Sequence, residues 1–192
     1  MAITIIPTEN LFKEIVNHIK PAQVVLDIGC GIRPQNFIIP MVHICCEPHK
    51  EYLDYLKTKR SFQDNRTFVF LHSTWEALRS FPDKSVDTIF LLDVIEHLEK
   101  DEAFHLIKHM ERISTSQIII FTPLGFIPQN HPDGKDAWGM NGGKWQEHIS
   151  GWSPEDFGEK WNFFVSENFY TLDNKGKELN PPRGAFFAIK EL

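Results

Sequence analysis

Two histidines occupy positions from which an imidazole could take up a proton during a reaction. His97 belongs to "DVIEHLE", directly after an apolar run that ends at Leu92, and His148 belongs to "WQEHISGW". Histidine titrates near neutral pH and is the commonest general base. We therefore take His148 and His97 as the candidate catalytic residues. Five other histidines fall within predicted helices, strands or surfaces, where a structural role is expected: His18, His43, His49, His105 and His109.

A second group of residues is typical of a nucleoside-binding turn. In "VVLDIGCGIRP", Asp27 ends an apolar run and is followed by Gly29 and Gly31. Glycine allows a ligand to approach the backbone at the carboxyl end of a strand, where open α/β sheets bind their ligands. Glu47 follows Asp27 by twenty residues, at the end of the next apolar run "HICCE". An acid at that place can accept both hydrogen bonds of a ribose diol.

The chain after the glycines leaves little room for a helix. Pro34 disfavours a helical conformation at Arg33, and Pro40 ends any helix early. Arg33 also stands where a third glycine at the same spacing would fall. A helix N-terminus that could meet a pyrophosphate is therefore poorly formed, which disfavours a dinucleotide and favours a cofactor without phosphates.

Apolar runs alternate with segments of helical spacing along the chain. Five runs predict strands: residues 24–28, 42–46, 67–71, 88–92 and 117–121. Helical spacing predicts helices over residues 8–20, 51–59 and 101–113. Strands that alternate with helices predict an α/β fold with a mostly parallel sheet. Residues 163–170 and 186–190 are expected to form two closing strands, joined by the polar turn "DNKGKELNPPRG".

Residues 124–152 form a long segment with little periodicity. It is rich in Gly, Pro, Asn, Trp and His, and a loop of this length in a compact domain is typically a lid or a binding loop. We expect it to be a substrate or lid loop. Its aromatic side chains predict either a ring-stacking acceptor pocket or the apolar core of the lid: Phe126, Trp138, Trp145 and Trp152. Ser153 is expected to cap a following helix with Pro154 at its first position.

Length and charge limit the classes of function. A chain of 192 residues fits a single domain, 1–192, with one substantial core. The formal net charge of −6 and the lack of a Lys or Arg run argue against nucleic-acid binding. The sequence contains neither an apolar stretch of about 18 residues nor a leader, so we expect a cytoplasmic protein without a membrane span. The oligomeric state stays open.

Three stretches together resemble the class I S-adenosylmethionine-dependent methyltransferases: "LDIGCG", "FPDKSVDTIFLLDVIEHLE" and "IIIFTPLGF". The resemblance implies a Rossmann-like fold, with a seven-stranded mostly parallel sheet and helices on both faces, and a transferase of one-carbon groups that uses S-adenosylmethionine. Asp27, Gly29 and Gly31 would surround the methionine moiety, Glu47 would hold the ribose, and residues 73–75 would lie near the adenine. The full set of implied cofactor contacts is Asp27, Gly29, Cys30, Gly31, Glu47, Pro48, Ser73, Thr74, Trp75 and Asp93. Thr74 departs from the family, which often has an acid there.

A narrower resemblance concerns a metal ion. Asp93, Glu96 and His97 have a D-x-x-E-H spacing similar to the E-x-x-E-H of ubiquinone-biosynthesis O-methyltransferases and small-RNA 2′-O-methyltransferases, in which such residues bind a divalent ion. "EHISGWSPEDF", which contains His148, resembles a further part of the small-RNA enzymes. Carboxylate and imidazole ligands suit Mg²⁺, Mn²⁺, Fe²⁺ or Zn²⁺. The same Glu-His pair is structural in family members without a metal, so a divalent metal is not the favoured reading.

The favoured function is O-methylation of a hydroxyl on a small molecule or glycan. The loop "TPLGFIPQ" and the later "WQEHISGWSPEDF" resemble those of bacterial and archaeal methyltransferases of surface-glycan and other small-molecule pathways. Two alternatives stay open. One is an RNA methyltransferase, and the other is a non-catalytic partner subunit that binds S-adenosylmethionine.

Overall fold

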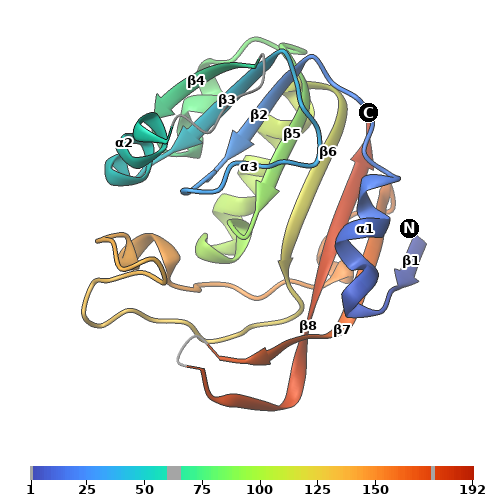
Figure 1. Cartoon of the computed structure of the whole chain (residues 1–192). Helices are drawn as coiled ribbons and strands as arrows, with labels where there is room; N and C mark the ends of the chain where they lie inside the picture. The colour runs from blue at the N-terminus through green and yellow to red at the C-terminus, as the bar shows by residue number, and fades with distance from the viewer. Residues whose placement is uncertain (1, 60–65, 174–175) are drawn as a thin grey trace.

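The computed structural model describes residues 2–59, 66–173 and 176–192. In these residues, eight strands form one sheet in the order β1-β7-β8-β6-β5-β2-β3-β4 (Figure 1). The strand β8 runs antiparallel to both of its neighbours, and every other pair is parallel. The strands are β1 (Ala2–Ile5), β2 (Val24–Ile28), β3 (Val42–Glu47), β4 (Thr67–His72), β5 (Val86–Leu92), β6 (Ser114–Pro123), β7 (Trp161–Leu172) and β8 (Glu178–Glu191).

The Rossmann-like α/β fold agrees with the prediction, but the sheet has one strand more than the seven expected. The extra strand is β1, which pairs in parallel with β7 at the sheet edge. All four of its residues are exposed. Backbone hydrogen bonds to β7 hold this strand, and its short sequence carries no clear burial pattern that would have predicted it.

Helices cover both faces of the sheet. The strand β2 sends alternate side chains to opposite faces. Val25 belongs to the same buried cluster as Leu11 and Ile15 of α1 (Leu11–Val16), whereas Leu26 belongs to the same buried cluster as Leu106 of α3 (Lys100–Ile113). In Figure 1, α1 accordingly lies in front of the sheet and α3 behind it. The α-helices are α1 (Leu11–Val16), α2 (Lys50–Thr58) and α3 (Lys100–Ile113). No helix in the described residues combines the length and apolar character that a membrane span requires.

Two predicted helices are shorter than expected. The entry segment 8–20 forms the 3-10 turn η1 (Thr8–Asn10) and then α1, which ends at Val16. The helix expected after Ser153 is only the single turn η5 (Pro154–Asp156). The Ser153 N–H does donate to the Asp156 carboxylate at 2.8 Å, as a cap should. The chain leaves the helix directly afterwards because Phe157 and Trp161 are buried in the core against α3.

The closing hairpin is longer than predicted. The strand β8 begins at Glu178, inside the segment expected to be a turn. Its first part pairs with the end of β7, with Tyr170 opposite Arg183 and Leu172 opposite Glu178. The polar composition of this part concealed a strand that is stabilised by cross-strand backbone hydrogen bonds.

The connection between β2 and β3 contains no helix, as Pro34 and Pro40 predicted. Phe37 and Ile38 from this connection pack on the face of the sheet that also carries α1. They cover apolar surface there in place of a helix.

Candidate active site

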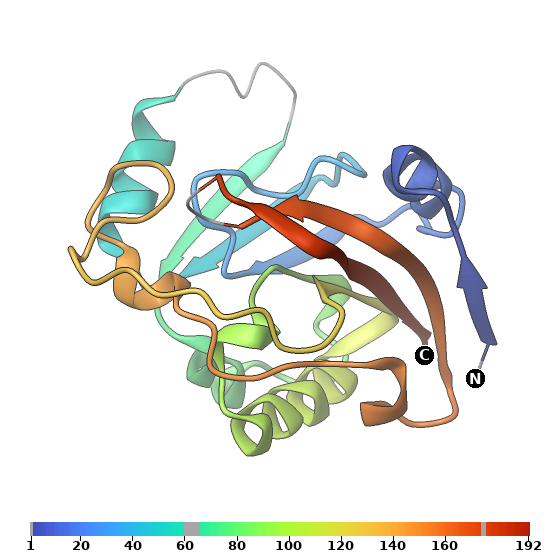
Figure 2. The same ribbon diagram turned by 90° about the horizontal axis from the view of Figure 1, so that it is seen from below.

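The carboxyl ends of the central strands open into a cavity of about 1350 Å³. The segment 124–152 passes below these strand ends and runs toward α2 (Figures 1 and 2). Every predicted cofactor contact lines this cavity except Asp27. The lining members are Gly29, Cys30, Gly31, Glu47, Pro48, Ser73, Thr74, Trp75 and Asp93.

The turn after β2 requires its glycines. Gly29 and Gly31 have φ values of +65° and +53°, in the left-handed region that side chains with a Cβ rarely adopt. A Cβ on Gly29 would also lie 2.5 Å from Val94 Cγ2. Together these constraints keep the backbone of the turn bare toward the cavity.

Asp27 lies beneath this turn, where it organises the chain. Its side chain is 2% exposed, and its Oδ2 accepts the Gln35 N–H at 2.7 Å. The same oxygen lies 3.2 Å from His43 Nε2. Asp27 is therefore not among the residues that line the cavity, and its expected place around the methionine moiety stays a prediction. Because no helix follows the turn, the Gln35 N–H has no helical partner, and the carboxylate satisfies it.

Glu47 lies at the cavity wall with its carboxylate already oriented. Its Oε2 accepts the Gly31 N–H at 2.9 Å, and its Oε1 accepts the His49 N–H at 2.8 Å. Burial raises the pKa of this carboxyl to about 7 despite these two bonds. Each carboxylate oxygen can accept a further hydrogen bond, so the group can still receive two donors from a ligand.

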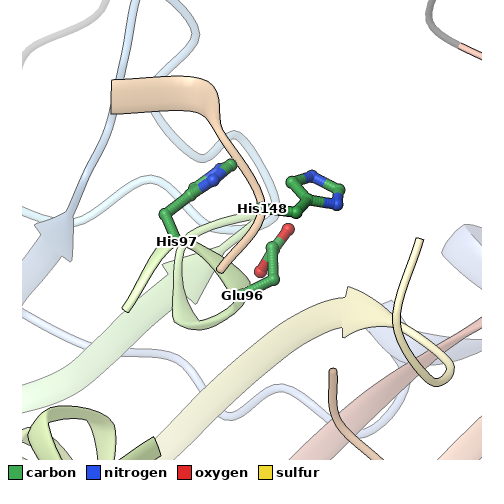
Figure 3. A group of neighbouring side chains, drawn as sticks. All are labelled: Glu96, His97 and His148. Carbon is green, nitrogen blue, oxygen red and sulfur yellow. The ribbon is translucent and has the colours of Figure 1, made fainter. Parts of the chain in front are cut away.

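Glu96, His97 and His148 converge on the other side of the cavity (Figure 3). Glu96 and His97 belong to η3 (Ile95–His97), which follows β5, and His148 belongs to the long loop. One ligand atom of each side chain lies within 4.8 Å of the others. The loop is fixed there because the Ile149 and Ser150 N–H groups donate to the Glu96 carbonyl at 2.8 and 3.0 Å. The two histidines expected to share this space are therefore brought together.

Both histidines are oriented by the backbone. His97 Nδ1 lies 2.9 Å from the Glu147 carbonyl, and His148 Nδ1 lies 2.7 Å from the Ile127 carbonyl. A carbonyl oxygen only accepts, so each Nδ1 carries the proton and each Nε2 keeps its lone pair. Burial lowers the pKa of both rings, that of His148 to about 4. Both rings are therefore neutral at pH 7 and can act as a base or as a metal ligand.

Asp93 and Glu96, the first two acids of "DVIEHLE", differ in position. Glu96 is 2% exposed, accepts the Thr122 hydroxyl at 3.0 Å, and has its pKa raised to about 7 by burial. Asp93 also lines the cavity, and burial followed by the nearby charge of Glu96 raises its pKa. Asp93, the fourth residue considered for a metal, is not part of the converging group of Glu96, His97 and His148.

His131 also lies in this region, although the sequence did not predict it there. Among the described residues, its Nε2 is buried and has no hydrogen-bond partner. Burial is the main cause that lowers the pKa of His97 and His148, and an electrostatic interaction with His131 is the smallest cause for both, so His131 lies near both rings. The signal that could have indicated His131 was its position in "QNHPDG", within a long loop rich in Gly and Pro.

The four loop aromatics do not form one pocket. Trp152 is 1% exposed and packs in the core with Phe157. Phe126 and Trp145 are 50% and 41% exposed. Trp138 lies over the glycine turn, since a Cβ on Gly31 would be 2.9 Å from its Cη2. Trp152 therefore belongs to the main core of the domain and not to a separate core of the lid, whereas Trp138 faces the turn predicted to hold the cofactor.

Comparisons with known proteins find methyltransferases among the chains that are similar to this one. A family model described as a methyltransferase domain matches residues 26–117. A ubiquinone biosynthesis O-methyltransferase of Rickettsia bellii is 25% identical over 175 residues, which cover 87% of this chain and 66% of the relative. A tRNA N(3)-cytidine methyltransferase of Mus musculus is 24% identical over 100 residues, 46% of this chain and 25% of that protein. The chain thus spans slightly less than two thirds of the first relative.

Solved structures share the fold at low identity. A SAM-dependent methyltransferase from Methanosarcina mazei has a TM-score of 0.65 and 13% identity, with 93% of this chain and 96% of that chain covered. A second SAM-dependent methyltransferase, from Archaeoglobus fulgidus, has a TM-score of 0.55 and 16% identity, with 96% and 94% covered. At such identities the likeness concerns the fold alone.

Proposed function

Because this chain belongs to the class I S-adenosylmethionine-dependent methyltransferases, we propose that it transfers the methyl group of S-adenosylmethionine to a hydroxyl of a small molecule or glycan. One observation carries the proposal. The bare glycine turn, the oriented carboxylate of Glu47 and the group of Glu96, His97 and His148 all face a single cavity. Methyl transfer needs an in-line approach of the acceptor to the methyl carbon, and a cavity with two chemically different sides can align the partners.

In this proposal the cofactor lies against the carboxyl ends of β2, β3 and β4. Gly29 and Gly31 leave room for the methionine moiety, and Asp27 holds their turn from beneath. The Glu47 carboxylate accepts the ribose hydroxyls, and residues 73–75 lie near the adenine. At Thr74 a hydroxyl stands where the family often has an acid.

The acceptor oxygen loses its proton as it attacks. A bond forms between this oxygen and the methyl carbon while the carbon–sulfur bond breaks, and the electron pair of that bond remains on sulfur in S-adenosylhomocysteine. The proton goes to Nε2 of His148, which is free because Nδ1 donates to the Ile127 carbonyl. His97, whose ring centroid lies 5.1 Å from that of His148, orients the base.

A divalent metal is a second means to the same reaction. Glu96, His97 and His148 offer one carboxylate and two neutral imidazoles whose Nδ1 atoms already bond to carbonyls, an arrangement common among metal-ligating histidines. This donor set fits Mn²⁺, Fe²⁺ or Zn²⁺. A metal bound there would lower the pKa of an acceptor hydroxyl.

Two further functions stay as alternatives. The mouse relative favours an RNA acceptor, which the net charge of −6 opposes. A non-catalytic cofactor-binding subunit would not need a histidine pair oriented at the acceptor side. A cytoplasmic location likewise stays an expectation.

Calorimetry with purified protein tests the proposal. We expect S-adenosylmethionine and S-adenosylhomocysteine to bind, and NAD not to bind measurably, because no helix follows the glycine turn to meet a pyrophosphate. Mass spectrometry of extracts incubated with protein and cofactor should then find an acceptor that has gained one methyl group. Binding of NAD more tightly than of S-adenosylmethionine would contradict the proposal.

A further inference from the structure

We infer that Asp136 and Tyr52 form a latch that holds Trp138 as the roof of the cofactor site. The inference rests on the proposed function and assigns part of the long loop to the cofactor. Trp138 was expected to bind an acceptor or to fill the lid. Its contacts lie instead on the side of the cavity formed by the glycine turn and α2.

The Asp136 carboxylate builds the local turn of the loop. It is 7% exposed, and its Oδ1 accepts the N–H groups of Trp138 and Met140, each at 2.9 Å. Its Oδ2 accepts the Gly142 N–H at 3.0 Å and the Tyr52 hydroxyl. Burial alone would raise the pKa of Asp136, but these donors hold it below its ordinary value. The carboxylate is therefore charged at neutral pH and fixes three backbone amides of the turn.

Tyr52 ties this turn to α2. Its hydroxyl donates to Asp136 and also lies 3.3 Å from Gln146 Nε2, which donates to it. Beside it, the Asn141 amide donates to the Glu51 carboxylate at 3.1 Å. A Cβ on Gly142 would lie 1.8 Å from the Tyr52 hydroxyl. The loop therefore lies so close to the helix that only glycine fits at this position. The loop and α2 approach one another in both Figure 1 and Figure 2.

The latch determines where Trp138 lies. The ring of Tyr52 meets that of Trp138 edge-on, with centroids 5.0 Å apart and planes at 73°. The edge of the indole that carries Cη2 and Cζ3 approaches Gly31, whose N–H donates to Glu47. Trp138 therefore stands next to the groups proposed to hold the ribose and the methionine moiety. His148, by contrast, is anchored to residues 127 and 129 of the same loop.

One loop thus serves both substrates with different parts. Residues 136–146 close the cofactor side, and residues 127–132 with His148 face the acceptor side. A roof held by a charged, buried hydrogen bond excludes water from the bound cofactor and adds aromatic contact. Asp136 and Tyr52 act through Trp138, so they are positioning residues for cofactor affinity.

The test compares S-adenosylhomocysteine binding by calorimetry in single and double variants. Tyr52→Phe removes only the hydroxyl, and we expect the dissociation constant to rise roughly tenfold, the effect of one charge-assisted hydrogen bond. Asp136→Asn should have a similar or larger effect. Tyr55→Phe is the matched control, because it removes a hydroxyl from the same helix at a residue outside the cavity lining. It should bind as the unmodified protein does.

A double-variant cycle separates a roof from a general structural role. If the latch acts through Trp138, then Trp138→Ala should weaken binding, and adding Tyr52→Phe to it should weaken binding no further. Amide exchange at Trp138, Met140 and Gly142 should accelerate in Asp136→Asn. Tyr52→Phe keeps every apolar contact, so it remains informative if Asp136→Asn does not fold.

The outcomes distinguish a failure of the proposed function from a failure of the roof formed by Trp138. If the unmodified protein binds neither S-adenosylmethionine nor S-adenosylhomocysteine, the proposed function fails. If it binds, while Tyr52→Phe and Trp138→Ala bind with unchanged affinity, the roof is refuted and the proposed function stands. Additive losses in the double variant would also refute a latch that works through Trp138.

Discussion

Replacing His148 with alanine is expected to lower turnover by about 10²–10⁴-fold and to leave the dissociation constant of S-adenosylmethionine nearly unchanged. The imidazole is neutral, its Nδ1 donates to the Ile127 carbonyl, and its Nε2 is left to take the acceptor's proton. His148 lies across the cavity from Glu47 and the glycine turn, so cofactor affinity should not depend on it. Turnover is measured with the acceptor identified from extracts.

The control is His105→Ala, which removes an exposed histidine from α3. This variant should retain full turnover and full affinity. Full turnover in His148→Ala itself would remove His148 from the chemistry, both as a base and as a metal ligand. A parallel loss of cofactor affinity would indicate that the substitution disturbs the loop that also carries Trp138.

Chelation distinguishes the two roles of His148. If Glu96, His97 and His148 hold a metal that the reaction needs, a chelator should abolish turnover in the unmodified protein, and added Mn²⁺, Fe²⁺ or Zn²⁺ should restore it. If His148 is the base, chelation should leave turnover unchanged.

The pH dependence of turnover is a second check on His148 as the base. Because burial lowers the pKa of His148 to about 4, the ring stays neutral between pH 5 and 7, and protonation of His148 should not reduce turnover there.

The central strands were predictable because strands that are buried on both faces have apolar sequences. Parallel strands covered on both faces, such as β2 and β5, appear as continuous apolar runs. The edge strand β1 is exposed along its whole length, and the start of β8 is polar, so neither carries that signal. The helix expected after Ser153 had a correct cap, but the burial of Phe157 in the core overrode the local preference.

The residues that line the cavity were predictable where short motifs at the ends of neighbouring strands supply them, as at Gly29, Gly31 and Glu47. It was not predictable where the geometry depends on distant partners. Tyr52 and Asp136 are separated by 84 positions, and no residue close to either one in the sequence indicates that they are in contact. The hydrogen bond from the Gln35 N–H to Asp27 likewise joins residues eight positions apart across a segment without regular structure, and no motif predicted it.

Replacing Glu47 with alanine should weaken the binding of S-adenosylmethionine and S-adenosylhomocysteine by about 1–3 kcal/mol, roughly 5–150-fold. The proposed cause is the loss of charge-assisted hydrogen bonds from the ribose hydroxyls. Calorimetry measures the affinity, and Glu14→Ala, which removes a half-exposed carboxylate from α1, is the control. Unchanged affinity in Glu47→Ala would mean that the ribose lies elsewhere.

The pH dependence of binding gives an independent check on Glu47. Its pKa in the free protein is raised to about 7 by burial, and donors from a ribose diol favour the charged form. Protonation of Glu47 therefore competes with the ligand, so the dissociation constant of the unmodified protein should rise as pH falls from 8 to 6. The Glu47→Ala protein lacks the titrating group and should lose that part of the pH dependence. An unmodified protein whose affinity is the same at pH 6 and pH 8 would show that the Glu47 carboxylate does not hold the cofactor.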